Sequence, residues 1–341
     1  MSGVTRDPGD TTGDATGGGP GGANGQARGP GLATGGLATG GAPSGGVRKV
    51  GDGTGGFRGR GRAGARAAGT ARGRVRTVGG IAGAVLSGVV VAAALVSLVW
   101  TPHDPTRVNP DDSWAPISWE HWFGADRLGR DLFSMVLAGA GTTLYVSVAA
   151  TAVAAVVGTV LAAASTSRRA GAAVGYAIDV LIAFPTLLLA MVLVAVYGAG
   201  TLVAITAIGL GEGFFVARVL RAEMARVLAS DFVTAARAGG AGAARILREH
   251  VLPNVLPTLT VLLSLVMGIS VLAEAALSYL GFGVPAETPT WGRLLHDLQP
   301  QITIRPGVLL WPGLAIVVTV LGFNLLGDAV REAGDPRVRV R

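Results

Sequence analysis

The chain has 341 residues, of which 50% are hydrophobic and only 14% are charged. Soluble domains of this length carry about a quarter charged residues, so the long uncharged stretches indicate a membrane protein rather than one oversized core. The absence of cysteine excludes disulfides and thiolate metal sites, and the net charge of +7 fits either nucleic-acid binding or basic cytoplasmic loops.

Residues 1–77 form a low-complexity segment of glycine, alanine, threonine, proline and arginine. The segment has almost nothing to bury and cannot offset the entropy of ordering, so we expect a disordered cytoplasmic tail. Its arginine run is interpreted first as solvated charge that keeps the N-terminus inside, and second as a binder of anionic lipid headgroups or nucleic acid. The run comprises Arg58, Arg60, Arg62, Arg66, Arg72, Arg74 and Arg76.

Six apolar stretches follow, and each is long enough to cross a ~30 Å hydrocarbon core as a helix. They lie at about 79–100, 137–164, 176–197, 200–218, 256–281 and 308–327. We therefore predict an all-α integral membrane protein in which residues 78–341 form a domain of six transmembrane helices. The fourth stretch is the weakest because Glu212 interrupts it. Small residues such as Gly79, Gly83 and Gly88 predict close packing between helices.

Basic residues alternate between the connections. Eleven Lys or Arg and four acids precede the first span, whereas the loop 101–135 has three Arg and six acids. Residues 219–255 carry five arginines, and the loop 282–307 carries two. Because basic residues concentrate on the cytoplasmic side of membrane proteins, both termini and residues 219–255 are predicted to be cytoplasmic. This distribution favours membrane topology over nucleic acid as the reason for the positive charge.

The cytoplasmic segment 219–255 is predicted to contain two short helices. Ser230 is placed to cap the first, and Gly240 to end it, since glycine supplies the left-handed backbone that a helix end needs. A second helix is expected over about 243–250, ended by Pro253, which has no N–H to continue it. Such a pair of helices with a small-residue face is suited to a groove on a soluble partner.

One set of residues in this segment has a recognisable spacing: Thr234, Ala235, Ala236, Gly240, His250, Leu252 and Pro253. It resembles the EAA loop of bacterial ABC import permeases. The resemblance implies that the loop docks into a separate ATPase subunit and transmits closure of the nucleotide sites to the spans. A glutamate is common in that family where Thr234 stands, so a salt bridge from that position is not implied here.

A second motif lies between the first two predicted spans and comprises Gly124, Asp126, Gly129, Arg130 and Asp131. It resembles the GTD-x-x-GRD signature of the dipeptide and oligopeptide permease group, with alanine in place of threonine at position 125. Further resemblances to that group lie at 183–185, 280–283, 288–292, 323–328 and 335–337. Together they cover roughly residues 100–340, and they imply the second-permease type of the dipeptide, oligopeptide and nickel importer family.

Each motif also has a purely structural interpretation. Phe184-Pro185 is either a helix kink or a gate. The stretch from Leu280 to Gly283 can end a span without touching a ligand. The residues from Asp126 to Asp131 can form a capped, self-paired outer loop rather than a docking surface for a binding protein.

Three carboxylates lie inside predicted spans, where an ionised group is costly and is a functional candidate. Glu274 is the best placed to line a polar path. Glu212 either faces the passage or pairs with Arg218. Asp179, near the inner end of the third span, is expected to snorkel or to pair with Arg168 or Arg169 just before that span.

The chain shows no site for a nucleotide or a metal. Its only lysine, Lys49, does not stand in a Walker A context, so ATP is expected to be bound by partner subunits. The histidines are scattered without metal-ligand spacing, so neither a bound metal nor another cofactor is predicted. They are His103, His121, His250 and His296.

The family resemblance implies a permease subunit in a bacterial plasma membrane that forms half of a pathway for di- or oligopeptides. It also implies a second permease subunit, two ATPase subunits and an extracytoplasmic solute-binding protein as partners, besides membrane lipid. Nickel or another small solute is the alternative substrate. A secondary transporter, a membrane enzyme and an anchored architectural protein are the other possible classes; the first would need internal repeats and broken spans in corresponding halves.

Overall fold

The computed structural model describes residues 58–333, with side chains from residue 78 onward. The regular elements in this part of the chain are helices, with no β-strand among them, so the all-α prediction is confirmed. The helices are α1 (Arg58–Ser97), α2 (Leu132–Ser165), α3 (Gly171–Leu181), α4 (Thr186–Tyr197), α5 (Thr201–Leu228), α6 (Asp231–Ala238), α7 (Ala243–Ile246), α8 (Leu252–Tyr279), α9 (Trp291–Leu298) and α10 (Leu310–Ala333).

Five helical segments in the described residues are long and apolar enough to cross a membrane, and a bent pair of helices makes a sixth. The continuous segments are Val78–Ser97, Leu132–Ser165, Thr201–Leu228, Ala243–Tyr279 and Pro306–Glu332. Each of the six predicted stretches coincides with one of these segments or with the bent pair. The prediction of a six-span membrane domain is therefore confirmed in length and composition.

The third predicted span is the bent pair. α3 ends at Leu181 and α4 begins at Thr186, and the two helices form an angle of 89°. Pro185 occupies the N-cap of α4 with ψ of 131°. Because proline has no N–H and disfavours helical backbone in the residue before it, the helix stops there and restarts. The kink predicted at Phe184-Pro185 is confirmed, in the form of a complete break.

The first helix begins earlier than predicted. α1 starts at Arg58, inside the segment 1–77 that was expected to form a tail, and the disorder of that tail stays a prediction. Alanine and arginine are good helix formers, and the apolar span after them provides the nucleus from which the helix extends. Residues 1–57, the rest of the predicted tail, lie outside the described part.

Glycines explain why the fourth span looked weak in hydropathy. A Cβ at Gly209 would lie 2.6 Å from the Val153 side chain, and one at Gly213 would lie 3.1 Å from Val157. On the facing helix, a Cβ at Gly158 would lie 2.5 Å from Val216. α2 and α5 therefore interlock through small residues, which is how helices associate in lipid without a hydrophobic driving force.

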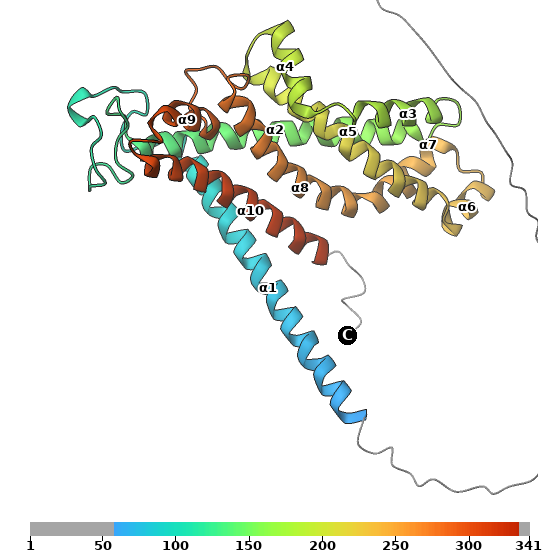
Figure 1. Cartoon of the computed structure of the whole chain (residues 1–341). Coiled ribbons are helices and arrows are strands. Elements are labelled where there is room, and N and C mark those ends of the chain that lie inside the picture. The colour runs from blue at the N-terminus through green and yellow to red at the C-terminus, as the bar shows by residue number, and fades with distance from the viewer. Residues whose placement is uncertain (1–57, 334–341) are drawn as a thin grey trace, which may run out of the picture. The chain divides into compact units, whose positions relative to one another are not determined.

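α1 and α10 pack side by side in the same way (Figure 1). A Cβ at Gly83 would lie 2.6 Å from the backbone nitrogen of Leu326, so only glycine permits this approach. Gly79 and Gly88 have no atom within 4 Å of a Cβ position and lie away from this contact. The predicted role of small residues is thus correct for Gly83 and wrong for the other two.

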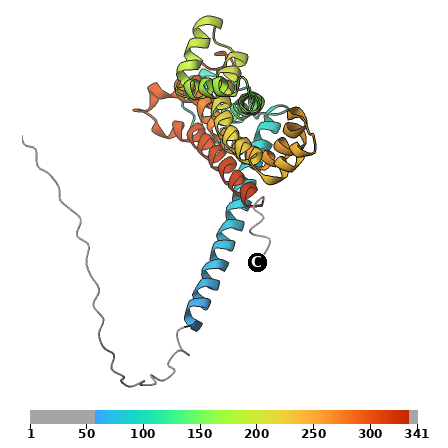
Figure 2. The ribbon, with the colours of Figure 1, turned by 90° about the vertical axis from the view of Figure 1, so that its right-hand side faces the viewer.

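The functional segments gather at two ends of the α2–α5 pair. α9 and the loop that precedes α2 lie at one end, and α6 and α7 lie at the other (Figure 1). Figure 2 looks from the α6 and α7 end, so the long helices that lie horizontally in Figure 1 are seen close to end-on. α9 is held by Trp291, whose Nε1 donates to the carbonyl of Val136 at 2.9 Å, and by Gly292, where a Cβ would lie 2.1 Å from the carbonyl oxygen of Ala275.

Candidate functional site: a helical elbow and an outer loop

α6, α7 and the turn between them, residues 231–246, form an exposed elbow between the two long helices α5 and α8. Val233 is the one fully buried side chain of α6. Thr234 and Ala235 are exposed, and Ala236 is partly exposed. Phe232 is 48% exposed, so the free face of α6 has an apolar side chain among small residues. This face is available for a partner.

The turn at the end of α6 is a Schellman motif. Gly240 has φ of +84°, and its N–H donates to the carbonyl of Arg237 at 3.0 Å. The N–H of Ala241 donates to the carbonyl of Ala236, also at 3.0 Å. These two bonds satisfy the last carbonyls of the helix and require a left-handed residue at Gly240. The predicted helix stop is confirmed.

The predicted N-terminal cap of α6 is correct in position and wrong in chemistry. Ser230 is the N-cap residue, with extended backbone at ψ of 154°, but its side chain makes no capping hydrogen bond. Its Oγ instead donates to the carbonyl of Val227, in the last turn of α5. Ser230 therefore links α6 to the preceding helix. Thr234 behaves alike, with its Oγ1 donating to the carbonyl of Ser230 at 3.3 Å.

Pro253 does not end the second helix of the elbow, contrary to the prediction. α7 continues through a π-helical turn, Leu247–Val251, into α8, and Ala243–Tyr279 is one segment of 37 residues. Proline is tolerated in the first turn of a helix, where its missing N–H is not needed, and the π-turn changes the hydrogen-bond register just before it. The elbow is thus joined directly to a long membrane helix.

The π-turn also contacts α6. The rings of Phe232 and His250 lie 6.2 Å apart, edge to face. Asn254 Nδ2 donates to the carbonyl of His250 at 2.6 Å, and Leu252 packs against the core cluster that contains Val233. α6 is therefore in direct side-chain contact with the turn that leads into α8.

A groove of about 780 Å³ opens beside the elbow, between α7 and the connection from α2 to α3. Arg168, Arg169 and Arg237 contribute to its lining, and Ala241 and Ala244 form part of the wall. Three guanidinium groups around small side chains make this groove suited to an acidic group of a partner.

Asp179 pairs with different arginines from those predicted. Its carboxylate lies 3.8 Å from Arg218 Nε and 3.5 Å from Arg221 Nη1, both on α5. The pairing with Arg168 or Arg169 and the pairing of Arg218 with Glu212 are therefore wrong. The break before α4 lets α3 run back along α5, and that path brings Asp179 to the arginines of α5.

The two other span carboxylates are buried. Glu274 has no exposed surface; Ser278 Oγ donates to its Oε1 at 2.7 Å, and its Oε2 has no hydrogen-bond partner within the described residues. Glu212 is 7% exposed, and Thr186 at the start of α4 lies 3.5 Å from its Oε1. Neither carboxylate reaches an open surface of this chain, and their role in a passage stays a prediction.

The outer-loop motif builds its own loop. Asp126 Oδ1 accepts the N–H groups of Leu128 and Arg130 at 2.8 and 2.9 Å, and its Oδ2 lies 2.7 Å from the Arg130 guanidinium. Gly129 has φ of +72°, and a Cβ there would overlap the carbonyl oxygen of Asn109. Gly124 has φ of +78°. The interpretation as a capped, self-paired loop is confirmed.

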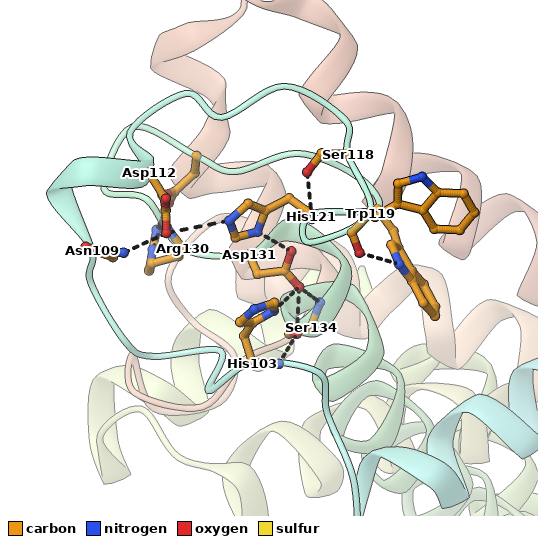
Figure 3. A network of polar contacts seen from close by, with 11 residues as sticks. His103, Asn109, Asp112, Ser118, Trp119, His121, Arg130, Asp131 and Ser134 are labelled. Atoms are coloured by element: carbon orange, nitrogen blue, oxygen red, sulfur yellow. Dashed lines mark hydrogen bonds and ion pairs between the residues drawn. The ribbon is translucent and has the colours of Figure 1, made fainter.

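Asp131 caps α2 and also gathers two histidines. Ser134 N–H donates to its Oδ2 at 2.8 Å, which is a side-chain N-cap. His121 Nδ1 lies 3.0 Å from Oδ1, and His103 Nδ1 lies 3.8 Å from Oδ2 (Figure 3). The prediction that the histidines are scattered is wrong for this pair. Their separation of 18 positions carries no motif, so only the folded loop reveals them.

Five continuous helical segments and one bent pair that are long and apolar enough to cross a membrane indicate a multi-pass membrane protein, with a self-paired loop at one end and an exposed helical elbow at the other. Residues 154–340 match the family described as "Binding-protein-dependent transport system inner membrane component". The chain belongs to this family, whose members are the membrane permease components of ABC importers and act with separate ATPase subunits and solute-binding proteins.

Three curated relatives illustrate the match. The dipeptide transport system permease protein DppC of Alkalihalophilus pseudofirmus is 34% identical over 261 residues, which cover 76% of this chain and 86% of the relative. The nickel transport system permease protein NikC of Escherichia coli K12 is 34% identical, covering 74% and 92%. The glutathione transport system permease protein GsiD of Escherichia coli O6:K15:H31 is 39% identical, covering 65% and 74%.

One solved structure, an inward-facing conformation of the MetNI methionine ABC transporter, aligns with 58% of this chain and 95% of its own at a TM-score of 0.49 and 19% identity. The family match confirms the predicted resemblance and the predicted permease function. Among the classes considered from the sequence, it removes the secondary transporter and the membrane enzyme.

Proposed function

We propose that this chain forms half of a passage for di- or oligopeptides, in a heterodimer with a second, similar permease. The relatives for dipeptide and glutathione transport support a peptide substrate, and the outer-loop motif at Gly124–Asp131 is of the kind that the peptide permease group carries. Nickel is the second candidate, because the nickel permease is 34% identical over 92% of its length.

We further propose that the elbow is the docking site for an ATPase subunit. The observation that carries this proposal is the position of α6: it is anchored by the single buried Val233 and lies between two membrane-length helices. A partner that pushes on α6 moves α5 through the Ser230–Val227 contact and α8 through the Phe232–His250 contact. A movement of the ATPase subunit outside the membrane would thus displace both α5 and α8.

The basic groove beside the elbow supports the same docking. Arg168, Arg169 and Arg237 line it without an acidic residue among its lining side chains. An acidic side chain on the ATPase subunit would complete the charge balance. In this chain Thr234 stands where related permeases commonly carry a glutamate, so the charged part of the contact would come from the arginines of the groove and would have the opposite sign.

For the passage itself, the proposed lining includes Glu274 and Glu212. Two polar atoms on α2 and α8, Ser147 Oγ and Glu274 Oε2, have no hydrogen-bond partner within the described residues. Unpartnered polar groups at membrane depth are costly, which supports a role in a hydrated path or in contact with the second permease. Both helices also carry exposed apolar side chains, such as Leu272 at 48%, for lipid or that partner.

The proposed orientation places the elbow and both termini in the cytoplasm of a bacterial cell. The arginines in 219–255 and those before the first span support this side, and the acidic loop 101–135 supports the opposite one. The arginines of α1 that are closest to the span would then lie near the anionic inner leaflet. Accessibility of single cysteines introduced at Ala235 and Trp119 to an impermeant reagent tests the orientation.

The function is tested by uptake into proteoliposomes that contain this chain, its companion permease and the ATPase subunits, with the binding protein outside the vesicles. We expect ATP-dependent uptake of labelled dipeptide and no uptake when the ATPase subunits are omitted. Uptake of nickel and not of peptide would select the second candidate. Uptake by this chain alone under a proton gradient would overturn the proposal.

Docking at the elbow is tested separately by Ala236→Arg, which places a long charged side chain beside the free face of α6. We expect normal insertion and loss of ATP-dependent uptake. Ala172→Arg is the matched control, because Ala172 is an exposed alanine of α3, outside the elbow. Equal uptake by the two variants would exclude the elbow as the docking site.

A further inference from the structure

We propose that His103, His121 and Asp131 form a binding site for a divalent first-row transition metal in the outer loop. Their ligand atoms all lie within 4.8 Å of one another. The three residues come from separate places: His103 follows α1, His121 lies in the middle of the loop, and Asp131 caps α2 (Figure 3). This site is independent of the substrate that crosses the membrane and of the docking at the elbow.

The carboxylate of Asp131 is held in place with one oxygen left for a metal. Its Oδ2 accepts Ser134 N–H at 2.8 Å and Ser134 Oγ–H at 2.6 Å. Its Oδ1 has only His121 Nδ1 as a hydrogen-bond neighbour in the described residues, at 3.0 Å. The carboxylate is 2% exposed, so its orientation is determined by the protein and not by solvent.

His121 has the support typical of a metal-ligating histidine. Its backbone N–H donates to Ser118 Oγ at 3.1 Å, and its carbonyl accepts the N–H groups of Ser118 and Gly124. The second ring nitrogen, Nε2, lies 3.6 Å from Asp112 Oδ2. A ligating histidine commonly directs its other N–H toward a carboxylate, which increases its basicity and fixes the ring.

His103 is the one proposed ligand whose side chain is free to change its orientation. Its backbone N–H donates to Ser134 Oγ at 3.0 Å, which ties the chain to the cap of α2. Its side chain is 44% exposed; its Nδ1 lies 3.8 Å from Asp131 Oδ2, the oxygen that Ser134 occupies, and the ligand atoms of the three residues lie within 4.8 Å of one another. Ligand atoms around a zinc ion at ~2.0–2.2 Å are about 3–3.5 Å apart. A small rotation of this free side chain would therefore complete the set.

The site has an access path and an open position. A cavity of about 260 Å³ borders His103 and Asp131 and is also lined by Glu120 and three tryptophans. The tryptophans are Trp100, Trp119 and Trp122. With two imidazoles and one carboxylate as ligands, water can take the fourth position. The set suits Zn²⁺, Ni²⁺ or Cu²⁺, and not Mg²⁺ or Ca²⁺, which require oxygen ligands.

The local charge also favours a cation. Asp131 and Asp112 lie on two sides of His121, and the nearest arginine of the motif, Arg130, is paired with Asp126 at 2.7 Å. With neutral histidines the cluster carries uncompensated negative charge. A divalent ion would neutralise it and would join the loop to the start of α2.

The test is calorimetric titration of the full chain in nanodiscs, purified with a tag free of histidine and treated with chelator. We expect saturable binding of one Ni²⁺ or Zn²⁺ per chain and none of Mg²⁺. His103→Ala should weaken the affinity at least ~10-fold, since even outer partners of metal ligands contribute that much. It should leave metal-free thermal stability unchanged, because the side chain is half-exposed and its backbone hydrogen bond remains.

His296→Ala is the matched control: it removes an exposed histidine that contacts Tyr279 edge to face and lies outside the cluster. It should bind metal like the wild type. In parallel, Ni²⁺ should raise the unfolding temperature of the wild type and of His296→Ala, and not that of His103→Ala. Unsaturable binding, or the same affinity in His103→Ala and the wild type, would overturn the proposal and leave a purely structural His–Asp network.

Discussion

Replacing Gly240 with alanine tests whether the shape of the elbow controls coupling. Gly240 has φ of +84°, and a Cβ there would meet no atom within 4 Å, so the substitution adds no clash with neighbouring elements. Its whole effect comes from the left-handed backbone, which costs an L-residue roughly 1–2 kcal/mol. A cost of that size reduces the population of the native turn relative to open forms by a factor of about 5–30.

Two measurements report this change. Hydrogen exchange of the Ala241 amide, which donates to Ala236 in the wild type, should accelerate by about the same 5–30-fold. ATP-driven uptake should fall several-fold, with normal amounts of protein in the membrane. Gly240→Pro should abolish uptake, because proline requires φ near −65° and removes the N–H that bonds to Arg237.

Gly242→Ala is the control for this prediction. Gly242 has φ of −70°, which alanine adopts freely, and a Cβ there also meets no atom within 4 Å. The same chemical change two positions away should therefore leave exchange and uptake close to wild type. If Gly240→Ala and Gly242→Ala gave equal uptake while exchange at Ala241 differed, the turn would exist without controlling coupling, and the reasoning would be refuted.

Three further predictions concern the spans. Gly158→Ala should destabilise the chain by ~1–3 kcal/mol in thermal unfolding, because its Cβ would lie 2.5 Å from Val216. Gly88→Ala should not, because the space around Gly88 is open, and equal stabilities of the two variants would contradict the interlocked packing of α2 and α5. Trp291→Phe should cost ~0.5–1.5 kcal/mol, because the partly buried Val136 carbonyl of α2 loses the hydrogen bond from the indole, and an unchanged unfolding temperature would argue against that bond. Glu274→Gln should keep the fold, since the amide is isosteric, and should slow uptake; normal uptake would remove Glu274 from the proposed passage.

The spans could be predicted from the sequence because hydropathy depends on composition over a long window. The elbow could be predicted because glycine has a local conformational meaning, and Gly240 takes the backbone that it was expected to take. Pro253 failed as a helix stop because its effect depends on the turn before it. The π-turn at Leu247–Val251 allows the helix to continue past Pro253, and no residue pattern predicts such a turn.

The remaining failures involve residues brought together by chain path. Asp179 meets Arg218 and Arg221 only because the chain breaks at Pro185 and α3 lies along α5. His103 and His121 meet Asp131 only because the loop folds back through Gly124 and the Ser134 contact. Neither of these chain paths can be predicted from the spacing of the residues along the sequence. Local chemistry could thus be read from the sequence, whereas long-range pairing required the structure.

The lengths of the two helices that flank α6 set how far the elbow stands from the lipid. α5 and α8 each have 28 residues and rise ~42 Å, which is well beyond a ~30 Å hydrocarbon core. The helical turns of α5 and α8 that exceed the hydrocarbon thickness would place the elbow beyond the lipid headgroups. In the proposed docking, a water-soluble ATPase subunit could then bind the elbow without displacing lipid. Removing one helical turn from α5 and one from α8 would move the docking surface some 5 Å toward the lipid and would leave every residue of the elbow in place.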